Sequence, residues 1–365
     1  MTSPWFRRYP RISLLIVNAA VLILVLFSAE LFLRLVVPYN PGYYMSVSGT
    51  SREVIYPYGV IKINSLGYPD EEFDGTRAKR VGYFGDSVTY GVGAGYGHRI
   101  SELLESAYPS YDHLNFGGVG LSISYEDIRR FSEISSEFHL DHAIYLFNLN
   151  DIVPTAVTVG EEKTVAVRLR GITERYFDWM RGRSYLYTYL RTKLKNLLET
   201  RGVGFHGYEA YELFPHRSSR AVRETAKRIV RLNETLNQQG VDLTVVGLPY
   251  EMQISAEAAR EYARLGIRWE DGFLDGSTQE LISRLLPAQV RWIDARLAFL
   301  KGEGIESSRA KNGLGEFFVY DRGDKLDWNH PNREGHRAIA RYLVEQEILG
   351  PPAGAGDVAA EPVGP

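Results

Sequence analysis

The pattern of hydrophobic and polar residues divides the chain into an apolar start and a long alternating region. Residues 12–29 are apolar except for two serines and one asparagine, and residues 31–37 continue the run. Together they reach the roughly 20 residues that a helix needs to cross a bilayer. Glu30 and Arg34, four residues apart at the far end, can pair on one face of this helix. We therefore predict a membrane-spanning helix over residues 12–37.

The charges around this helix predict its orientation. Arg7, Arg8 and Arg11 precede it, whereas cations are sparse in the segment that follows. Since cationic flanks stay on the cytoplasmic side, we expect residues 1–11 in the cytoplasm and the bulk of the chain in the periplasm or outside the cell.

Two alternatives to an anchor in the cytoplasmic (inner) membrane remain. A cleaved signal peptide would be cut after Phe27-Ser28-Ala29, where Phe stands in place of a small residue. A buried helix of a soluble protein is the third alternative. The length of the apolar run favours an uncleaved, single-pass anchor over both.

Beyond residue 80, short apolar runs alternate with helical periodicity. The expected strands are Val81–Gly85, His113–Phe116, Ala143–Leu149, Leu243–Leu248 and Val290–Ile293. The expected helices are Ile100–Ala107, Ser124–Ile134, Tyr185–Leu198, Ser219–Gln239, Thr278–Leu285 and Glu334–Glu347. Such alternation predicts an α/β protein whose mostly parallel, five-stranded sheet is covered by helices on both faces.

The remaining segments flank or interrupt the main domain, which we expect over residues 81–350. Residues 38–80 are rich in Tyr, Gly and Pro and predict a linker that packs on this domain. Residues 155–214 are too long for a simple connection and predict a partly helical insertion or cap. The apolar stripe that we expect to pack on the core consists of Leu186, Leu190, Leu194 and Leu197. Residues 351–365, rich in Pro, Gly and Ala, predict a disordered tail.

Composition and charge narrow the classes of function. The chain has 365 residues, of which 44% are hydrophobic and 24% charged, as expected of a folded protein. A net charge of -3 gives no electrostatic reason to expect nucleic acid as a partner. The chain has no cysteine, which excludes disulfides, thiolate metal sites and cysteine nucleophiles. None of these numbers indicates an oligomeric state.

Gly85-Asp86-Ser87 follows the first expected strand and offers a serine nucleophile. Ligands of α/β sheets bind beyond the carboxyl ends of the strands, where Ser87 is expected to lie. A serine nucleophile needs a base, and usually a carboxylate that orients the base. Asp327 and His330 are three residues apart, so both side chains can project from one short turn, with one imidazole nitrogen facing Ser87. Taken in isolation, this pair is more typical of a surface capping turn.

Oxyanion donors are the next requirement, because preorganised donors often contribute the largest catalytic effect. Gly120 lies in a glycine-rich stretch after the second expected strand, where a backbone N–H can approach a ligand closely. Asn150 follows the third expected strand, with Asn148 and Asp151 beside it. Glycines also make turns and Asn-Asp pairs also cap helices, so each motif alone is weak. The order of all of them along the chain makes the set much stronger.

In order and spacing, these residues resemble the four sequence blocks of the SGNH subgroup of GDSL hydrolases, over roughly residues 64–347. The resemblance implies a three-layer α/β/α, flavodoxin-like fold. It also implies a catalytic triad of Ser87, His330 and Asp327, with no cofactor and no metal.

The same resemblance implies an oxyanion hole made by the N–H groups of Ser87 and Gly120 and the side chain of Asn150. Asp86 and Asp151 occupy supporting positions beside them. One residue departs from the family pattern: Asn148 stands where the third block usually begins with glycine. This larger side chain can narrow the site or add a polar contact.

Competing motifs are incomplete. The chain has no Gly-x-Ser-x-Gly elbow, which disfavours the α/β-hydrolase fold. The glycine run from Gly91 to Gly97 lacks the Lys-Ser/Thr that completes a phosphate-binding loop. A metal site formed by Asp324, Asp327 and His330 is a minor alternative.

The site and the anchor together predict a serine esterase that acts on acyl esters, with acetyl the expected group. Transfer of the acyl group to a sugar hydroxyl instead of water would make the same site an O-acyltransferase, which the sequence does not separate from an esterase. A membrane-tethered position favours an acylated carbohydrate or lipid of the cell envelope as substrate, on location and family analogy alone. A membrane-anchored envelope scaffold without catalysis is the alternative from another class.

Overall fold

The chain folds into two units. Contacts group Met1–Ser46 with Glu162–Lys195, and Val47–Glu161 with Asn196–Pro365. The computed structural model describes residues 8–36, 53–56, 59–73, 75–152, 180, 184–199, 219–264, 274–301, 304–321 and 325–352. Residues 1–7 of the predicted cytoplasmic segment, most of the predicted insertion and the predicted tail from residue 353 lie outside the described residues.

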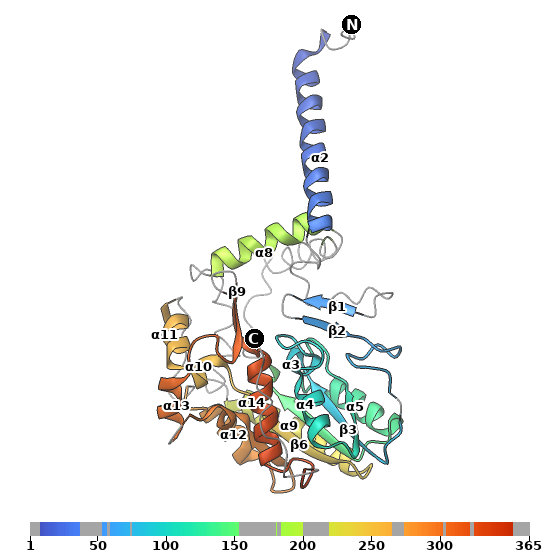
Figure 1. Ribbon diagram of the computed structural model, residues 1–365, viewed down its shortest axis with the longest axis vertical. Coiled ribbons are helices and arrows are strands. Elements are labelled where there is room, and N and C mark those ends of the chain that lie inside the picture. Colours follow the sequence, from blue (N-terminus) through green and yellow to red (C-terminus); the bar gives the residue numbers. More distant parts are fainter. Residues whose placement is uncertain are drawn as a thin grey trace, which may run out of the picture. The chain divides into compact units, whose positions relative to one another are not determined.

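A five-stranded parallel sheet forms the centre of the larger unit (Figure 1), with strand order β4-β3-β5-β6-β7. The strands are β3 (Lys79–Gly85), β4 (Tyr111–Asn115), β5 (His142–Phe147), β6 (Asp242–Gly247) and β7 (Arg291–Asp294). Every neighbouring pair is parallel. All five strands were predicted, with ends that differ by at most two residues.

Helices cover both faces of this sheet. α5 (Tyr125–Glu137), α9 (Ser219–Asn237) and α12 (Ser277–Leu285) bury apolar residues in one core cluster, which includes Phe84 of β3. α4 (Ile100–Ala107) and α14 (Arg333–Glu345) bury theirs in a second cluster, which includes Tyr83 of the same strand. Because successive residues of a strand point to opposite faces, the two clusters lie on opposite sides of the sheet. The expected three-layer α/β/α fold is confirmed.

Two antiparallel hairpins, which the sequence analysis did not predict, add to the larger unit. One joins β1 (Glu53–Tyr56) to β2 (Gly59–Lys62), and the other joins β8 (Phe318–Asp321) to β9 (Lys325–Pro331). The remaining short segments are α3 (Ser87–Tyr90), α10 (Glu251–Ile254), α11 (Ala256–Arg264), α13 (Ile305–Lys311), and the 3-10 turns η1 (Leu149–Asp151) and η4 (Ala295–Phe299).

The smaller unit contains α2 (Pro10–Val36) and the start of α8 (Tyr185–Glu199). α2 is long and apolar enough to cross a membrane, a test that a signal sequence also passes. The expected pair on this helix is confirmed, because Arg34 Nε lies 2.7 Å from Glu30 Oε1.

The leucine stripe of α8 differs from its prediction. Leu190, Leu194 and Leu197 are 56%, 57% and 46% exposed, so the expectation that they are buried in a core is wrong. Helical spacing shows which side chains share a face, but it does not show what covers that face.

Candidate active site

Ser87 lies where β3 ends and α3 begins. Gly85 makes the sharp turn with φ +145°, and a Cβ there would come within 2.8 Å of the Leu146 carbonyl oxygen, so only glycine fits. Asp86 caps the short helix, because its carboxylate accepts the N–H of Val88. β3 lies between β4 and β5, where the strand order reverses, and this is the position at which doubly wound sheets bind ligands.

Three residues that the sequence placed together meet in a hydrogen-bonded line. Ser87 Oγ lies 2.8 Å from His330 Nε2. His330 Nδ1 lies 2.7 Å and 2.8 Å from the two carboxylate oxygens of Asp327, which is almost fully buried. Since a carboxylate can only accept, Nδ1 carries the proton and Nε2 is left to accept the proton of Ser87. The arrangement therefore has the geometry of an activated serine nucleophile.

A bulge in β9 brings Asp327 and His330 to the same side. The β8–β9 ladder pairs Tyr320 with Leu326 and Phe318 with Pro331, so the four residues between Leu326 and Pro331 face a single residue of β8. Asp327 Oδ1 also accepts the backbone N–H of His330, at 3.2 Å, which closes this local loop. The short turn expected from the spacing is thus an irregularity within a strand, a feature that often redirects side chains beside active sites.

The three expected oxyanion donors are positioned in different ways. Asn150, in η1, donates from Nδ2 to the buried carboxylate of Asp86 at 2.9 Å. Gly120 is exposed, with φ +80°, and among the described residues no hydrogen bond joins it to the other candidate residues. Asp86 thus connects the loop after β3 to the loop after β5, whereas Gly120 stands apart from this network.

Asn148 adds a polar contact, which is one of the two effects expected of it. Its side chain is fully buried, and Oδ1 accepts the N–H of Leu149 at 2.8 Å. Nδ2 donates to Oδ1 of Asn329, which lies in the bulge that carries His330. The end of β5 is therefore bonded to the segment that carries His330. Asn329 was missed by the sequence analysis, although it stands between the two residues singled out there.

Asp151 supports this connection. It accepts the N–H of Asn148 at 2.9 Å and the hydroxyl of Tyr145 at 3.1 Å. Burial, and then the nearby charge of Asp86, raises the pKa of Asp151 well above its ordinary value. The carboxyl group thus holds the start of η1 from inside the core.

Glu251 was also missed by the sequence analysis, and it lies close enough to Asp327 for the two charges to interact. This buried carboxyl group, at the start of α10, accepts the hydroxyl of Tyr262 and the N–H of Gly315, each at 2.6 Å. Burial raises the pKa of Glu251 to about 7, and the charge of Asp327 contributes in the same direction. The only sequence signal was its place just after β6, at the sheet edge where Ser87 lies.

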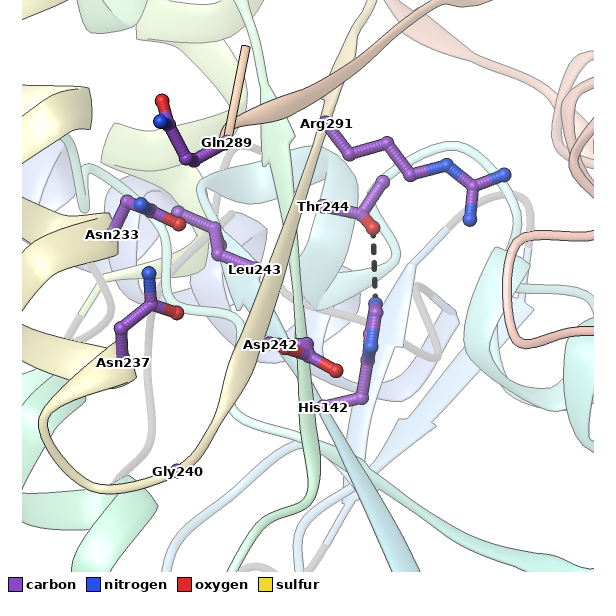
Figure 2. A pocket seen from close by; sticks show the side chains of 9 residues that line it. All are labelled: His142, Asn233, Asn237, Gly240, Asp242, Leu243, Thr244, Gln289 and Arg291. Atoms are coloured by element: carbon purple, nitrogen blue, oxygen red, sulfur yellow. Dashed lines mark hydrogen bonds between the residues drawn. The ribbon is translucent and has the colours of Figure 1, made fainter. Parts of the chain in front are cut away.

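A polar cavity of about 540 Å³ lies at the opposite edge of the sheet, where β5 and β6 begin. Figure 2 shows Asn233 and Asn237 of α9 on one side of it and Arg291 on the other. His142 Nε2 lies 3.0 Å from Thr244 Oγ1, and burial lowers the pKa of His142 to about 4. None of the candidate catalytic residues lines this cavity.

No group of three His, Asp or Glu side chains in the described part of the chain is arranged to hold a metal ion. Asp324, one member of the alternative metal site, lies outside the described residues.

Comparisons with known proteins agree with the geometry of a serine nucleophile. The model of the GDSL-like lipase/acylhydrolase family matches residues 81–343, which include every candidate site residue. No curated protein matches the sequence.

Three solved structures illustrate the similarity. A member of the lipolytic G-D-S-L family from Veillonella parvula is 15% identical, over 73% of this chain and 97% of that one, with a TM-score of 0.38. A GDSL-like lipase from Bacteroides thetaiotaomicron is 14% identical, over 74% and 88%, with a TM-score of 0.36. An acetyl xylan esterase is 15% identical, over 73% and 98%, with a TM-score of 0.40.

Proposed function

The chain belongs to the GDSL-like lipase/acylhydrolase family and is a serine ester hydrolase, and on this premise we propose that it removes acyl groups, acetyl foremost, from esters of cell-envelope carbohydrate or lipid. The observation that carries the proposal is the continuous line of hydrogen bonds from Ser87 through His330 to Asp327. A scaffold that only binds would have no need of an aligned nucleophile, base and acid.

The proposed reaction has two halves. His330 Nε2 takes the proton of Ser87 as Oγ attacks the ester carbonyl, and Asp327 stabilises the resulting imidazolium. His330 then gives the proton to the departing alcohol oxygen, which leaves an acyl group on Ser87. Water attacks this acyl-enzyme with His330 again as base, and the acid departs while Ser87 regains its proton.

Three donors are proposed to stabilise the negative oxygen of each tetrahedral intermediate: the N–H groups of Ser87 and Gly120 and the side chain of Asn150. Asn150 Nδ2 carries two protons, of which Asp86 accepts one. This bond fixes the amide plane, so that the second proton is available to the oxyanion. Loss of one such donor typically costs about 10²–10³ in rate.

The proposed location is the outer face of the cytoplasmic membrane. α2 is the proposed uncleaved anchor, with residues 1–11 inside and residues 81–350 outside. The arginines before α2 and its apolar length support this orientation. A tethered enzyme meets esters of the envelope more often than dilute soluble metabolites.

The nucleophile is tested by labelling the full-length chain with a fluorophosphonate. The wild type and Ser106→Ala, which removes an exposed serine on α4, are expected to label equally, whereas Ser87→Ala is expected not to label. Equal labelling of all three would refute the assignment of Ser87.

The substrate class is tested with acylated envelope oligosaccharides and with lipid esters, followed by mass spectrometry. Release of acetate to water, unaffected by added oligosaccharide acceptors, is the expected result. Movement of the acyl group onto an acceptor would instead identify an acyltransferase that uses the same acyl-enzyme.

A further inference from the structure

The start of α8 is bonded to the far end of α2. Glu30 of α2 accepts the N–H groups of Tyr185 and Leu186 at 3.0 Å and 2.8 Å, and the hydroxyl of Ser184 at 2.9 Å. The two N–H groups lie in the first turn of α8, where no carbonyl of the same helix can accept them. A carboxylate at this position also interacts favourably with the helix dipole.

Arg34 is a second residue of α2 that contacts the start of α8. We call Glu30 and Arg34, together with the groups of α8 that they contact, the clamp. Arg34, one turn beyond Glu30, binds the same carboxylate and places its guanidinium 5.0 Å from the centre of the Tyr185 ring. Charge pairing and a cation–π contact therefore add to the hydrogen bonds. Contacts between the two segments thus fix the point at which α8 begins.

The clamp lies at the level of a membrane surface, if α2 is the anchor of the proposed function, on which this inference rests. From Arg11 to Glu30 the helix rises about 28 Å, at about 1.5 Å per residue. The hydrocarbon core of a bilayer is about 30 Å thick. With Arg11 at one surface, Glu30 and the start of α8 are therefore at the other.

α8 exposes an apolar stripe that a water-facing helix does not need. Leu190, Leu194 and Leu197 recur at the spacing of one helix face and are each about half exposed. Their exposure argues against burial in a core, and the position of the clamp brings the helix that carries them to a bilayer.

The other residues of α8 are those of an interfacial helix. Its sequence contains Arg191, Lys193 and Lys195 and no acidic residue before Glu199. Tyr185, Tyr187 and Tyr189 lie in its first turns, and Lys193 Nζ is 6.0 Å from the centre of the Tyr189 ring. Tyrosines concentrate at membrane–water boundaries, and basic side chains attract anionic headgroups.

We propose that α8 is an interfacial helix: it lies in the headgroup layer of the bilayer that α2 crosses, with Leu190, Leu194 and Leu197 inserted among the upper acyl chains. Its partner is a bilayer that contains anionic phospholipid. The clamp at Glu30 makes insertion of α8 nearly intramolecular, because α2 already holds the helix beside the surface. The protein thus has two membrane contacts, one that spans the bilayer and one that lies on it.

The chain has no cysteine, so single spin labels report this arrangement in the full-length protein. Leu194→Cys labels the stripe, Leu22→Cys labels α2, and Leu285→Cys labels a leucine of α12 that is 47% exposed. The labelled proteins are reconstituted in vesicles of phosphatidylcholine and phosphatidylglycerol. Collisions with oxygen, which concentrates in the bilayer, are compared with collisions with a water-soluble nickel chelate.

The inference requires that the labels at positions 22 and 194 collide more with oxygen, and the label at position 285 more with nickel. A label at 194 that favours nickel while the label at 22 favours oxygen would overturn the inference and leave the anchor intact. Nickel access at position 22 would instead refute the proposed anchor. An immobile label at 194 that neither reagent reaches would reveal a protein partner, and would also overturn the inference.

The role of the anionic headgroups is tested with the label at position 194 in vesicles of phosphatidylcholine alone. The oxygen preference at position 194 is expected to weaken there, and to weaken again in anionic vesicles when Lys193→Gln is added. Equal preferences in both lipids would contradict the selection of anionic headgroups. Glu30→Gln, which weakens the clamp, is expected to raise the mobility of the label at 194.

Discussion

At the scale of single residues, Asp327 binds both the ring and the backbone of His330, the proposed base. The carboxylate accepts Nδ1–H of His330 and the backbone N–H of the same residue. In Asp327→Asn the amide can donate to Nδ1, which shifts the proton to Nε2 and leaves no acceptor for Ser87. We expect kcat on a chromogenic ester to fall about 10³–10⁴-fold, with KM little changed. A loss below tenfold with unchanged melting temperature would contradict this role.

Asn148 is the second single residue that we propose to test, as a residue that positions the segment of His330. Asn148→Asp keeps the acceptor for the N–H of Leu149 but loses the donor to Asn329. We expect a fall in kcat of about tenfold and a loss of about 1–3 kcal/mol in the free energy of unfolding, because the half-buried acceptor Oδ1 of Asn329 is left without its donor. The matched control, Asn329→Asp, retains an acceptor for Asn148 and is expected to keep its folding stability. Equal stability of both variants would argue against the bond.

Glu251 makes stability depend on pH. Its pKa is about 7 in the folded chain, against an ordinary 4.5, so the folded state holds this proton over a pH range in which the unfolded state has lost it. Stability from this group is therefore fully present below about pH 4.5 and is lost as the pH rises through 7. Glu251→Gln is expected to remove about 1–3 kcal/mol of that decline.

Chemical denaturation between pH 4.5 and 8 measures this effect. Glu257→Gln, which replaces an exposed carboxylate near the same loop, serves as control and is expected to keep the wild-type slope. Burial also raises the pKa of Asp70 to about 7. Asp70 therefore lowers the free energy of unfolding over the same pH range in every variant. Parallel profiles for Glu251→Gln and the wild type would contradict the prediction.

At the scale of elements, the glycine-rich loop that follows α3 sets the position of β9. Gly93 has φ +97°, and a Cβ there would clash with the Pro331 carbonyl oxygen and lie 2.9 Å from Val319. Gly93→Ala should therefore displace the strand that carries His330, and lower kcat at least about tenfold.

Gly97→Ala is the matched control for this clash. Gly97 has φ +82°, but a Cβ added there would meet nothing within 4 Å, so the alanine shares the backbone strain without the collision. We expect a cost of about 1–2 kcal/mol in unfolding free energy and nearly normal kcat. Equal kcat in the two variants would show that the contact with β9 does not matter.

Elements that the sequence predicted well are those whose side chains follow one period. β5 and β6 are buried apolar runs and α4 has regular helical spacing, so each was located to within two residues. β9 was missed because four of its residues leave the ladder, which destroys the alternation of a strand. β1 and β2 were missed because they lie in the segment rich in Tyr, Gly and Pro that was predicted to be a linker.

In the candidate site, too, the sequence predicted some residues and missed others. Ser87, Asp327 and His330 were singled out because their types and order along the chain restrict the chemistry, and the structure brings them within hydrogen-bond distance of one another. Asn329 and Glu251 were not, because their roles come from contacts with Asn148 and Gly315, which are distant in sequence. The exposure of Leu194 was missed for a related reason, since periodicity does not name a partner.

At the scale of the whole molecule, retention of α2 is the decisive question for location. An uncleaved anchor predicts that the protein isolated from membranes keeps the mass of the full chain, and that detergent but not alkaline carbonate extracts it. Intact-mass spectrometry checks the first and fractionation the second. A mature N-terminus at Glu30 would mean that the apolar segment is a cleaved signal.

The hydrogen bond between Ser87 and His330 joins residues that are 243 positions apart. During synthesis, at about 5–20 residues per second, Ser87 therefore emerges about 10–50 s before His330. A growing chain carries an inert hydroxyl for that whole interval. In the proposed mechanism Ser87 becomes a nucleophile only when His330 is in place, so a chain that ends before β9 is expected to lack esterase activity.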